Sequence, residues 1–204
     1  MNQVSSLNKQ PKTARGRKTR NKLLEAAESE FGEKGFHEAG ISGITYRAGV
    51  ALGTFYTYFE SKEEIFKALV NYMSRRTREW IGERVLGATD RLSAEQLGIE
   101  AYIEFARQHK AIYRIMTEAE FIAPAEYRQH YEGFAKAYRE NLEEAAERGE
   151  IRSGDFETWG WSIMGIAVFL GMRYADWDDS RSSAEIAKIV VDLIARGISP
   201  ESRK

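Results

Sequence analysis

The most constraining feature of this chain is the stretch 41–62, which reads ISGITYRAGVALGTFYTYFESK. Ile41, Ile44 and Ala48 recur at i, i+3 and i+7, a spacing that places them on one face of a short helix. Gly49 then interrupts the apolar pattern, as a glycine at a helix end does. The pattern therefore predicts one short helix that ends in a glycine turn.

A second short helix is predicted directly after that turn, because Phe55 and Phe59 lie four residues apart and mark a buried face. Two short helices joined by a glycine-containing turn form the helix-turn-helix motif, whose second helix lies in the DNA major groove. The other faces carry hydroxyl groups and almost no charge, which suits contacts with phosphates and base edges. These residues are Gly53, Thr54, Tyr56, Thr57 and Tyr58. Spacing alone is explained equally well by a small helical core with a polar exterior.

The order of residues in this stretch resembles the tetracycline-repressor (TetR) family of transcriptional regulators. The resemblance rests on Gly-Val at 49–50, Gly-Thr-Phe-Tyr-x-Tyr-Phe at 53–59 and Ser-Lys-Glu-Glu at 61–64, and it is strong over residues 17–69. The sequence departs from the usual family pattern at Gly40, Ser42, Ala51 and Leu52. These departures concern the details of base and phosphate contacts rather than the fold.

The resemblance implies an all-α protein of about nine helices, with a three-helix DNA-binding domain and a larger helical domain for ligand binding and dimerisation. We expect a flexible basic arm at 1–14 and a DNA-binding domain at 15–60, with the helix-turn-helix motif at about 40–59. The ligand-binding and dimerisation domain is expected at 61–204. The implied function is that of a repressor released from a palindromic double-stranded DNA operator by a small-molecule effector of unknown identity.

Charge is distributed unevenly along the 204 residues, although the net charge is only −1. Residues 1–62 carry ten Lys or Arg and six Asp or Glu, whereas the remainder carries twenty and twenty-five. A basic N-terminal part followed by an acidic remainder is expected of a DNA-binding domain attached to a regulatory domain. The absence of Cys fits a reducing cytoplasm, and no apolar run suggests a signal peptide or a membrane span.

A basic run that includes Arg15, Arg17 and Lys18 precedes the predicted motif. Such a run is either a solvated face or an element that reaches DNA phosphates or the minor groove. Ser61 and Glu64 form a predicted capping box, and Lys62 beside it adds positive charge to a helix start. Lys62 is either an exposed lysine or a phosphate clamp, and the family resemblance favours the clamp. Leu52 either contacts a thymine methyl group or packs inward.

The second half of the chain contains amphipathic helical patterns and one segment, 156–174, that is apolar on nearly every side. A helix of that kind must be covered all round. Together with an apolar stripe at 183–197, this segment predicts a four-helix homodimer interface, and a purely intramolecular core is the alternative. A further capping box, Ser93 to Gln96, is expected to begin a helix.

Many aromatic and methionine side chains lie in the expected ligand-binding domain, and some of them are expected to line a pocket. The candidate ligand-binding residues are Trp80, Tyr102, Phe105, Tyr113, Met116, Tyr131, Phe134, Met164 and Arg173. Arg173 is the one strong charge in the apolar segment, and it either reaches solvent, pairs with Asp176, or meets an anionic ligand. The resemblance permits acyl thioesters, fatty acids and aromatic compounds as ligands.

No motif for catalysis, phosphate binding or metal ligation is present, and the three His share no ligand spacing. We therefore expect no catalytic residues, no metal and no cofactor. Two other functions remain open: a DNA-binding regulator without a small-molecule effector, and a small-molecule-binding enzyme or carrier with a vestigial DNA-binding domain.

Overall fold

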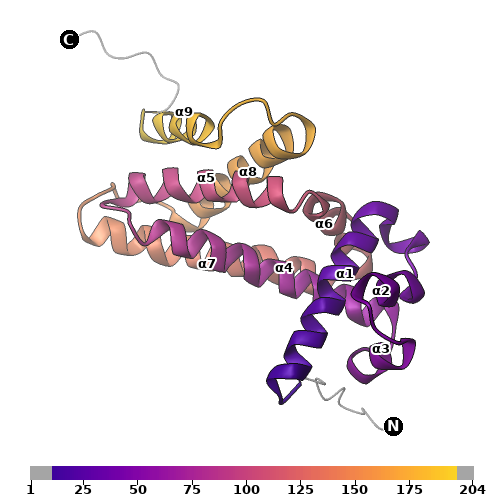
Figure 1. The fold of residues 1–204 in the computed structure, drawn as a ribbon. Coiled ribbons are helices and arrows are strands. Elements are labelled where there is room, and N and C mark those ends of the chain that lie inside the picture. The colour runs from indigo at the N-terminus through magenta and orange to yellow at the C-terminus, as the bar shows by residue number, and fades with distance from the viewer. Residues whose placement is uncertain (1–10, 197–204) are drawn as a thin grey trace, which may run out of the picture. The chain divides into compact units, whose positions relative to one another are not determined.

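The structure is a computed structural model that describes residues 11–196, and every regular element in that range is helical (Figure 1). The all-α prediction is therefore confirmed. Most of the expected arm at 1–14 lies outside the described residues. Within the described residues the helices form two compact units: the first comprises residues 11–73 and Arg114–Tyr127, and the second comprises Ser74–Tyr113 and residues 128–196.

Helix α1 spans Ala14–Glu38, and Thr13 fixes where it begins. The reason is a local cap: the hydroxyl oxygen of Thr13 accepts a hydrogen bond from the backbone N–H of Gly16 at 3.1 Å. The inward face of the helix is fully buried and consists of Leu23, Leu24, Ala27 and Phe31.

Gly35 interrupts α1 near its end, because its φ of 79° and ψ of 167° lie in a region that essentially only glycine adopts. The interruption leaves backbone groups without partners inside the helix. Side chains from the segment Arg114–Tyr127 satisfy them. Phe36 N–H donates to Glu118 Oε2 at 2.8 Å, and Arg114 Nη1 donates to the Glu33 carbonyl at 2.7 Å.

Helices α2 (Ile41–Ala48) and α3 (Leu52–Tyr58) form the helix-turn-helix, as the sequence pattern predicts. Gly49 ends α2 in the left-handed conformation, with a φ of 64°, so the chain can turn into α3 without strain. The fully buried side chains of this pair are Ile44 and Phe55, and Phe59 follows at the α3 end with almost no exposure.

Six longer helices follow: α4 (Lys62–Val85), α5 (Arg91–Gln108), α6 (Ala111–Ile122), α7 (Pro124–Glu147), α8 (Phe156–Gly171) and α9 (Ser183–Arg196). Helix α4 supplies residues to both compact units, since the division falls between Met73 and Ser74. Among residues 11–196, no helix is long and apolar enough to cross a membrane.

The start of α5 corrects the sequence analysis, which placed the N-cap at Ser93. The N-cap is Asp90, whose carboxylate accepts from Ser93 N–H at 2.8 Å, while the Ser93 hydroxyl accepts from Asp90 N–H at 3.1 Å. Ser93 is therefore the third residue of the box rather than its first.

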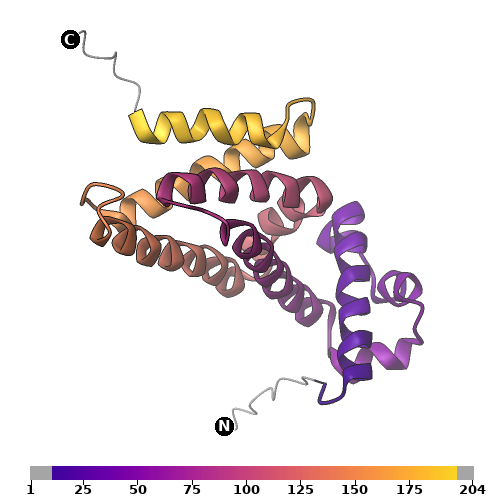
Figure 2. The same ribbon diagram turned by 60° about the vertical axis from the view of Figure 1, so that its left-hand side comes forward.

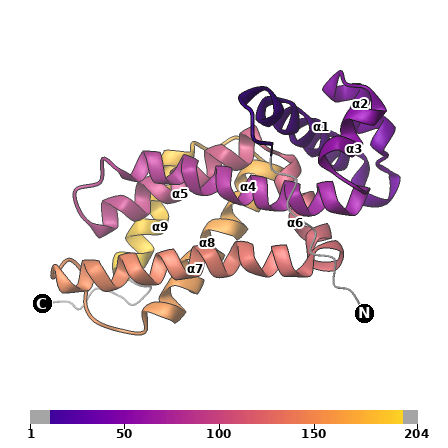
Figure 3. The same cartoon turned by 90° about the horizontal axis from the view of Figure 1, so that it is seen from below.

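In the second unit, α9 lies along α5, as Figure 2 shows, and α8 runs between α7 and α5 (Figure 3). Helix α8 approaches α7 closely at Gly160, where a β-carbon would lie 3.0 Å from Tyr138 Cβ. The apolar segment expected at 156–174 is not one α-helix, because α8 continues into a π-helical turn, Met172–Trp177. This arrangement encloses space between α4, α5, α7 and α8.

Replacing Gly35 with Ala tests the role of the α1 interruption. We expect a loss of about 3 kcal/mol or more in the free energy of unfolding, because the backbone conformation disfavours a side chain and the new β-carbon would lie 2.7 Å from Glu118 Oε1. Moving Glu118 away would break its bond to Phe36. Urea denaturation measures the loss.

Gly49→Ala is the matched control, since Gly49 also has a positive φ but a β-carbon there meets no atom within 4 Å. It should lose only about 1–2 kcal/mol. Equal losses in the two variants would show that the contact with Glu118 contributes nothing to stability.

Candidate DNA-binding surface and ligand cavity

The outward side of α3 forms the first candidate site and is called here the α3 surface. Leu52 is 53% exposed and Tyr56 is 48% exposed, so the inward packing considered for Leu52 does not occur. Gly53 is also exposed, whereas Thr54 and Tyr58 are half-buried. All five predicted α3 residues thus reach the surface beside the buried Phe55. Ser42, on α2, is exposed as well.

The basic start of α1 adjoins the α3 surface within the first unit. A β-carbon at Gly16 would lie 3.6 Å from Tyr58 Oη, which places the first turn of α1 beside the end of α3. Arg15, Arg17 and Lys18 surround this glycine in the sequence, and all three are exposed. The predicted cations and the predicted hydroxyl groups therefore belong to one surface.

Lys62 has a structural role that the sequence did not indicate. Its ammonium group donates to the carbonyl oxygens of Phe36, His37 and Ala39 at 2.8, 3.1 and 3.0 Å. An ammonium group has three N–H donors, so these bonds engage all of them. In this conformation Lys62 caps the end of α1.

Tyr46 is a candidate contact that the sequence analysis missed. It lies on α2 and is 88% exposed, so its ring has almost no packing role. In the sequence, Tyr46 lies off the helix face that Ile41 and Ile44 mark, and this position could have identified it as exposed. Its neighbour Arg47 is engaged within the unit, because the guanidinium forms ion pairs with Glu30 and Glu33.

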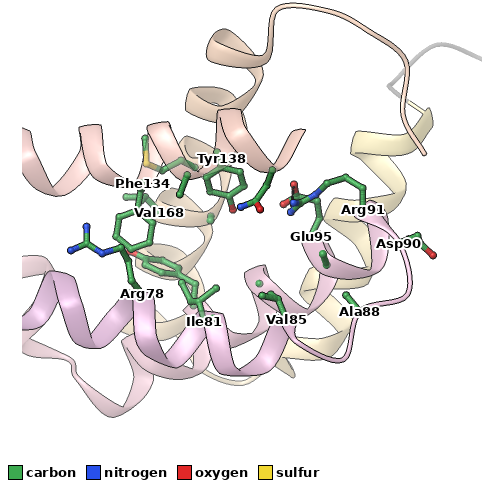
Figure 4. A pocket seen from close by; sticks show the side chains of 18 of the residues that line it. Arg78, Ile81, Val85, Ala88, Asp90, Arg91, Glu95, Phe134, Tyr138 and Val168 are labelled. Carbon is green, nitrogen blue, oxygen red and sulfur yellow. Dashed lines mark ion pairs between the residues drawn. The ribbon is translucent and has the colours of Figure 1, made fainter. Parts of the chain in front are cut away.

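A cavity of about 650 Å³ in the second unit forms the second candidate site (Figure 4). Side chains of α4, α5, α7 and α8 line it, together with the segment before α5 and residues after α7. Its middle is apolar, and charged groups lie toward its ends. Figure 4 shows Arg78 toward one end, Arg91 and Glu95 toward the other, and Tyr138 between them.

Four of the residues predicted to bind a ligand line this cavity: Tyr102, Tyr131, Phe134 and Met164. Burial raises the pKa of the Tyr102 hydroxyl, so this group is a neutral hydrogen-bonding partner. The four come from α5, α7 and α8.

The other five predicted residues lie outside the lining. Trp80 turns its indole N–H to the Ala101 carbonyl at 3.0 Å, and Phe105 is buried against the Trp80 ring. Tyr113 lies behind the lining, where its hydroxyl donates to the Val168 carbonyl at 3.1 Å.

Met116 is buried in the first unit. Arg173 is exposed and pairs with Asp178 at 3.2 Å rather than with Asp176, the partner considered from the sequence. Neither residue faces the cavity.

Polar residues of the lining are what the sequence analysis missed. The most buried are Glu95 and His130, and Arg91 forms an ion pair with Glu95, with Nη2 and Oε1 2.8 Å apart. Burial and then the charge of Arg78 lower the pKa of His130 to about 4, so its imidazole is neutral at neutral pH. In the sequence, Arg91 and Glu95 look like an ordinary surface pair at i, i+4, which is why they gave no signal.

Comparison with known proteins places these features in a family. Residues 23–69 match the model of bacterial regulatory proteins of the tetR family. The chain is 30% identical over 193 residues to the uncharacterized HTH-type transcriptional regulator YdgC of Bacillus subtilis, covering 92% of this chain and 96% of YdgC. It is also 30% identical over 186 residues to the fatty acid metabolism regulator protein of the same organism, covering 86% and 93%.

A solved structure has the same fold. The transcriptional regulator FadR from Bacillus subtilis, in complex with stearoyl-CoA, superposes with a TM-score of 0.76 at 23% identity, covering 88% of this chain and 99% of that one. The helix-turn-helix, the matched segment and the near full-length relatives agree. The chain belongs to the tetR family of bacterial regulatory proteins and is a helix-turn-helix transcriptional regulator.

Proposed function

We propose that this regulator is a cytoplasmic, non-enzymatic repressor that a small-molecule ligand releases from a palindromic operator. The observation that carries the proposal is the continuity of α4. The helix begins at Lys62, shortly after α3 ends, and its later residues Arg78, Ile81 and Val85 line the cavity. One helix is thus shared by the DNA-binding motif's unit and the cavity's unit.

The cavity supports a ligand with a substantial apolar part. Its volume falls within the range of roughly 300–1,000 Å³ that is typical of small-molecule sites, and such sites combine apolar walls with a few polar groups. FadR was solved with stearoyl-CoA, and a relative at 30% identity is named a fatty acid metabolism regulator. Acyl compounds are therefore the ligand class that we propose.

We propose that the α3 surface and the basic start of α1 contact the operator. Hydroxyl and cationic groups bind phosphates, and an exposed leucine at the start of the recognition helix suits a thymine methyl. The proposed contacts are Arg15, Arg17, Lys18, Ser42, Leu52, Gly53, Thr54, Tyr56, Tyr58 and Lys62.

We propose that α8 and α9 form the homodimer interface. Although Ile163 and Ile186 are buried within the chain, other large apolar side chains of these helices remain exposed. Phe169 is 68% exposed, and Ile189 and Leu193 lie one turn apart on α9. An apolar face of this kind supports burial against a second copy.

Lys62→Ala separates a DNA contact from a structural role. A contact with phosphate predicts that the slope of log K against log salt falls by about 1, with equal weakening for all sequences. The three hydrogen bonds to α1 predict a lower Tm. Fluorescence anisotropy with operator DNA and thermal unfolding measure the two effects.

Lys18→Ala is the control, because Lys18 is exposed and should change the salt slope while leaving Tm unaltered. A Lys62→Ala variant with an unchanged slope would remove Lys62 from the proposed contacts, and its effect would then be structural alone.

Leu52 predicts a sequence preference in the operator. Because its side chain is exposed at the start of α3, we expect thymine to be enriched in each half-site and the enrichment to disappear in Leu52→Lys. Binding-site selection from a random DNA pool measures this preference. An unenriched wild-type pool would contradict the role given to Leu52.

We expect ligand binding and operator binding to weaken each other. A dimer presents its recognition helices about 34–36 Å apart, or a multiple of that, and a ligand that favours another position of α4 changes the spacing. The coupling is typically about 1–3 kcal/mol and is reciprocal. Operator DNA should therefore weaken ligand binding by the same factor, about 5- to 150-fold, as the ligand weakens operator binding. Titration of decanoyl-CoA with and without operator tests this, and equal affinities would indicate a regulator that this ligand does not control.

A further inference from the structure

Glu95 is a buried carboxylate whose hydrogen bonds are not made. It is 2% exposed, it lies on α5, and its side chain lines the cavity. Neither carboxylate oxygen has a hydrogen-bond partner. A buried ionised group without hydrogen bonds destabilises the folded protein. The presence of Glu95 in the cavity wall therefore requires an explanation.

Arg91 neutralises the charge of Glu95 but does not fill the hydrogen-bonding capacity of its carboxylate. Its Nη2 lies 2.8 Å from Glu95 Oε1 without an aligned N–H, and its Nε has no partner at all. Burial raises the pKa of the Glu95 carboxyl, and the Arg91 guanidinium limits that rise through its charge and its close polar contact with Oε1. The cavity wall therefore carries an ion pair of zero net charge with an unpartnered donor at Arg91 Nε and unpartnered acceptors on Glu95.

The charged groups next to the pair are satisfied elsewhere. Glu150 accepts from the backbone N–H of Arg91 at 2.7 Å and from Arg148 Nε at 2.6 Å. Figure 4 shows the Arg91 and Glu95 side chains directed toward Tyr138 across the cavity, while Val85 and Ala88 form apolar wall nearby. Among the described residues, the buried polar atoms without a hydrogen-bond partner at this end of the cavity are Arg91 Nε and the two Glu95 carboxylate oxygens.

The ligand group that fits must supply an N–H or O–H to Glu95 and an oxygen to Arg91. A carboxamide supplies both, and a hydroxyl group does so with one atom. A free carboxylate has no hydrogen to donate at neutral pH and would lie beside the Glu95 charge. An ester has oxygen acceptors and no donor.

We propose that Arg91 and Glu95 form the head-group subsite of the cavity, and that they select an apolar-chain ligand with a neutral amide or hydroxyl group over a free fatty acid. This inference rests on the proposed ligand-binding function. It narrows the acyl class, because acyl compounds bound through an amide-containing carrier meet the requirement and their free acids do not.

Three probes with the same chain test the proposal: decanamide, methyl decanoate and decanoate. We expect decanamide to bind the full-length protein at least about tenfold more tightly than either of the others, since only it fills both bonding positions. Isothermal titration calorimetry at neutral pH without DNA measures the affinities. A preference for decanoate, equal affinities, or no binding of any probe would overturn the proposal.

Glu95→Gln removes the charge and keeps the shape of the side chain. Arg91 then lacks its partner, so decanoate should gain at least about tenfold relative to decanamide. Glu100→Gln, on the same helix but outside the lining, should leave the preference unchanged. An unaltered ratio in Glu95→Gln would show that Glu95 does not select the ligand.

A double variant, Arg91→Met with Glu95→Met, guards against instability, because replacing a buried ion pair with apolar residues is often neutral. It should bind the three probes with similar affinity, and a retained preference for decanamide would overturn the subsite. Anisotropy of labelled operator DNA separates this inference from the proposed function. Decanamide that binds selectively but fails to release operator would contradict the repressor mechanism and leave the subsite intact.

Discussion

The packing of the first unit depends on hydrogen bonds to the polar backbone groups around Gly35. An interrupted helix exposes N–H and C=O groups that cannot be left unpaired in a buried setting. Three charged side chains from outside α1 supply the partners: Glu118 and Arg114 of α6, and Lys62 of α4. Hydrogen bonds to charged groups are the stronger kind, so these contacts fix α1 against both helices. The aromatic cluster beneath, where Phe36 and Phe66 lie 5.1 Å apart, adds apolar packing to the same junction.

Two buried glutamates, one in each unit, differ in how the fold satisfies their carboxylates. Glu30 is 1% exposed, and burial opposes its ionisation, but hydrogen bonds from Lys34 and Arg47 outweigh burial and lower its pKa. Its carboxylate lies under Gly43 and holds α2 to α1. Glu95 has a single cation beside it and no well-aligned hydrogen bond, so burial prevails and its pKa is raised. The difference lies in the number of donors that the fold supplies, and Glu95, unlike Glu30, lines the cavity of the second unit.

The parts of this fold that the sequence predicts are those fixed by neighbouring residues. The α2–α3 motif follows from Gly49 and from the four-residue spacing of Phe55 and Phe59, both of which are local. The cavity lining is not local. Trp80 and Tyr102 are equally aromatic in the sequence, yet one turns its N–H to a backbone carbonyl and the other lines the cavity. Which of them faces the space depends on how four helices meet, and periodicity within one helix does not contain that information.

Helix α4 is not the only element that belongs to both units. Helix α6 contributes Ala111 to Tyr113 to the second unit and its remaining residues to the first. The hydroxyl groups of Tyr113 and Tyr102 lie 3.4 Å apart, and Tyr102 lines the cavity. The next residue, Arg114, donates to the carbonyl oxygens beside the α1 interruption. Under the proposed mechanism, a ligand that displaced Tyr102 would act on α6 as well as on α4, and both helices carry side chains that cap α1. Because α1 also holds α2 through Glu30, a switch of the proposed kind would reach the DNA-binding motif through α1 and would not require α4 to move alone.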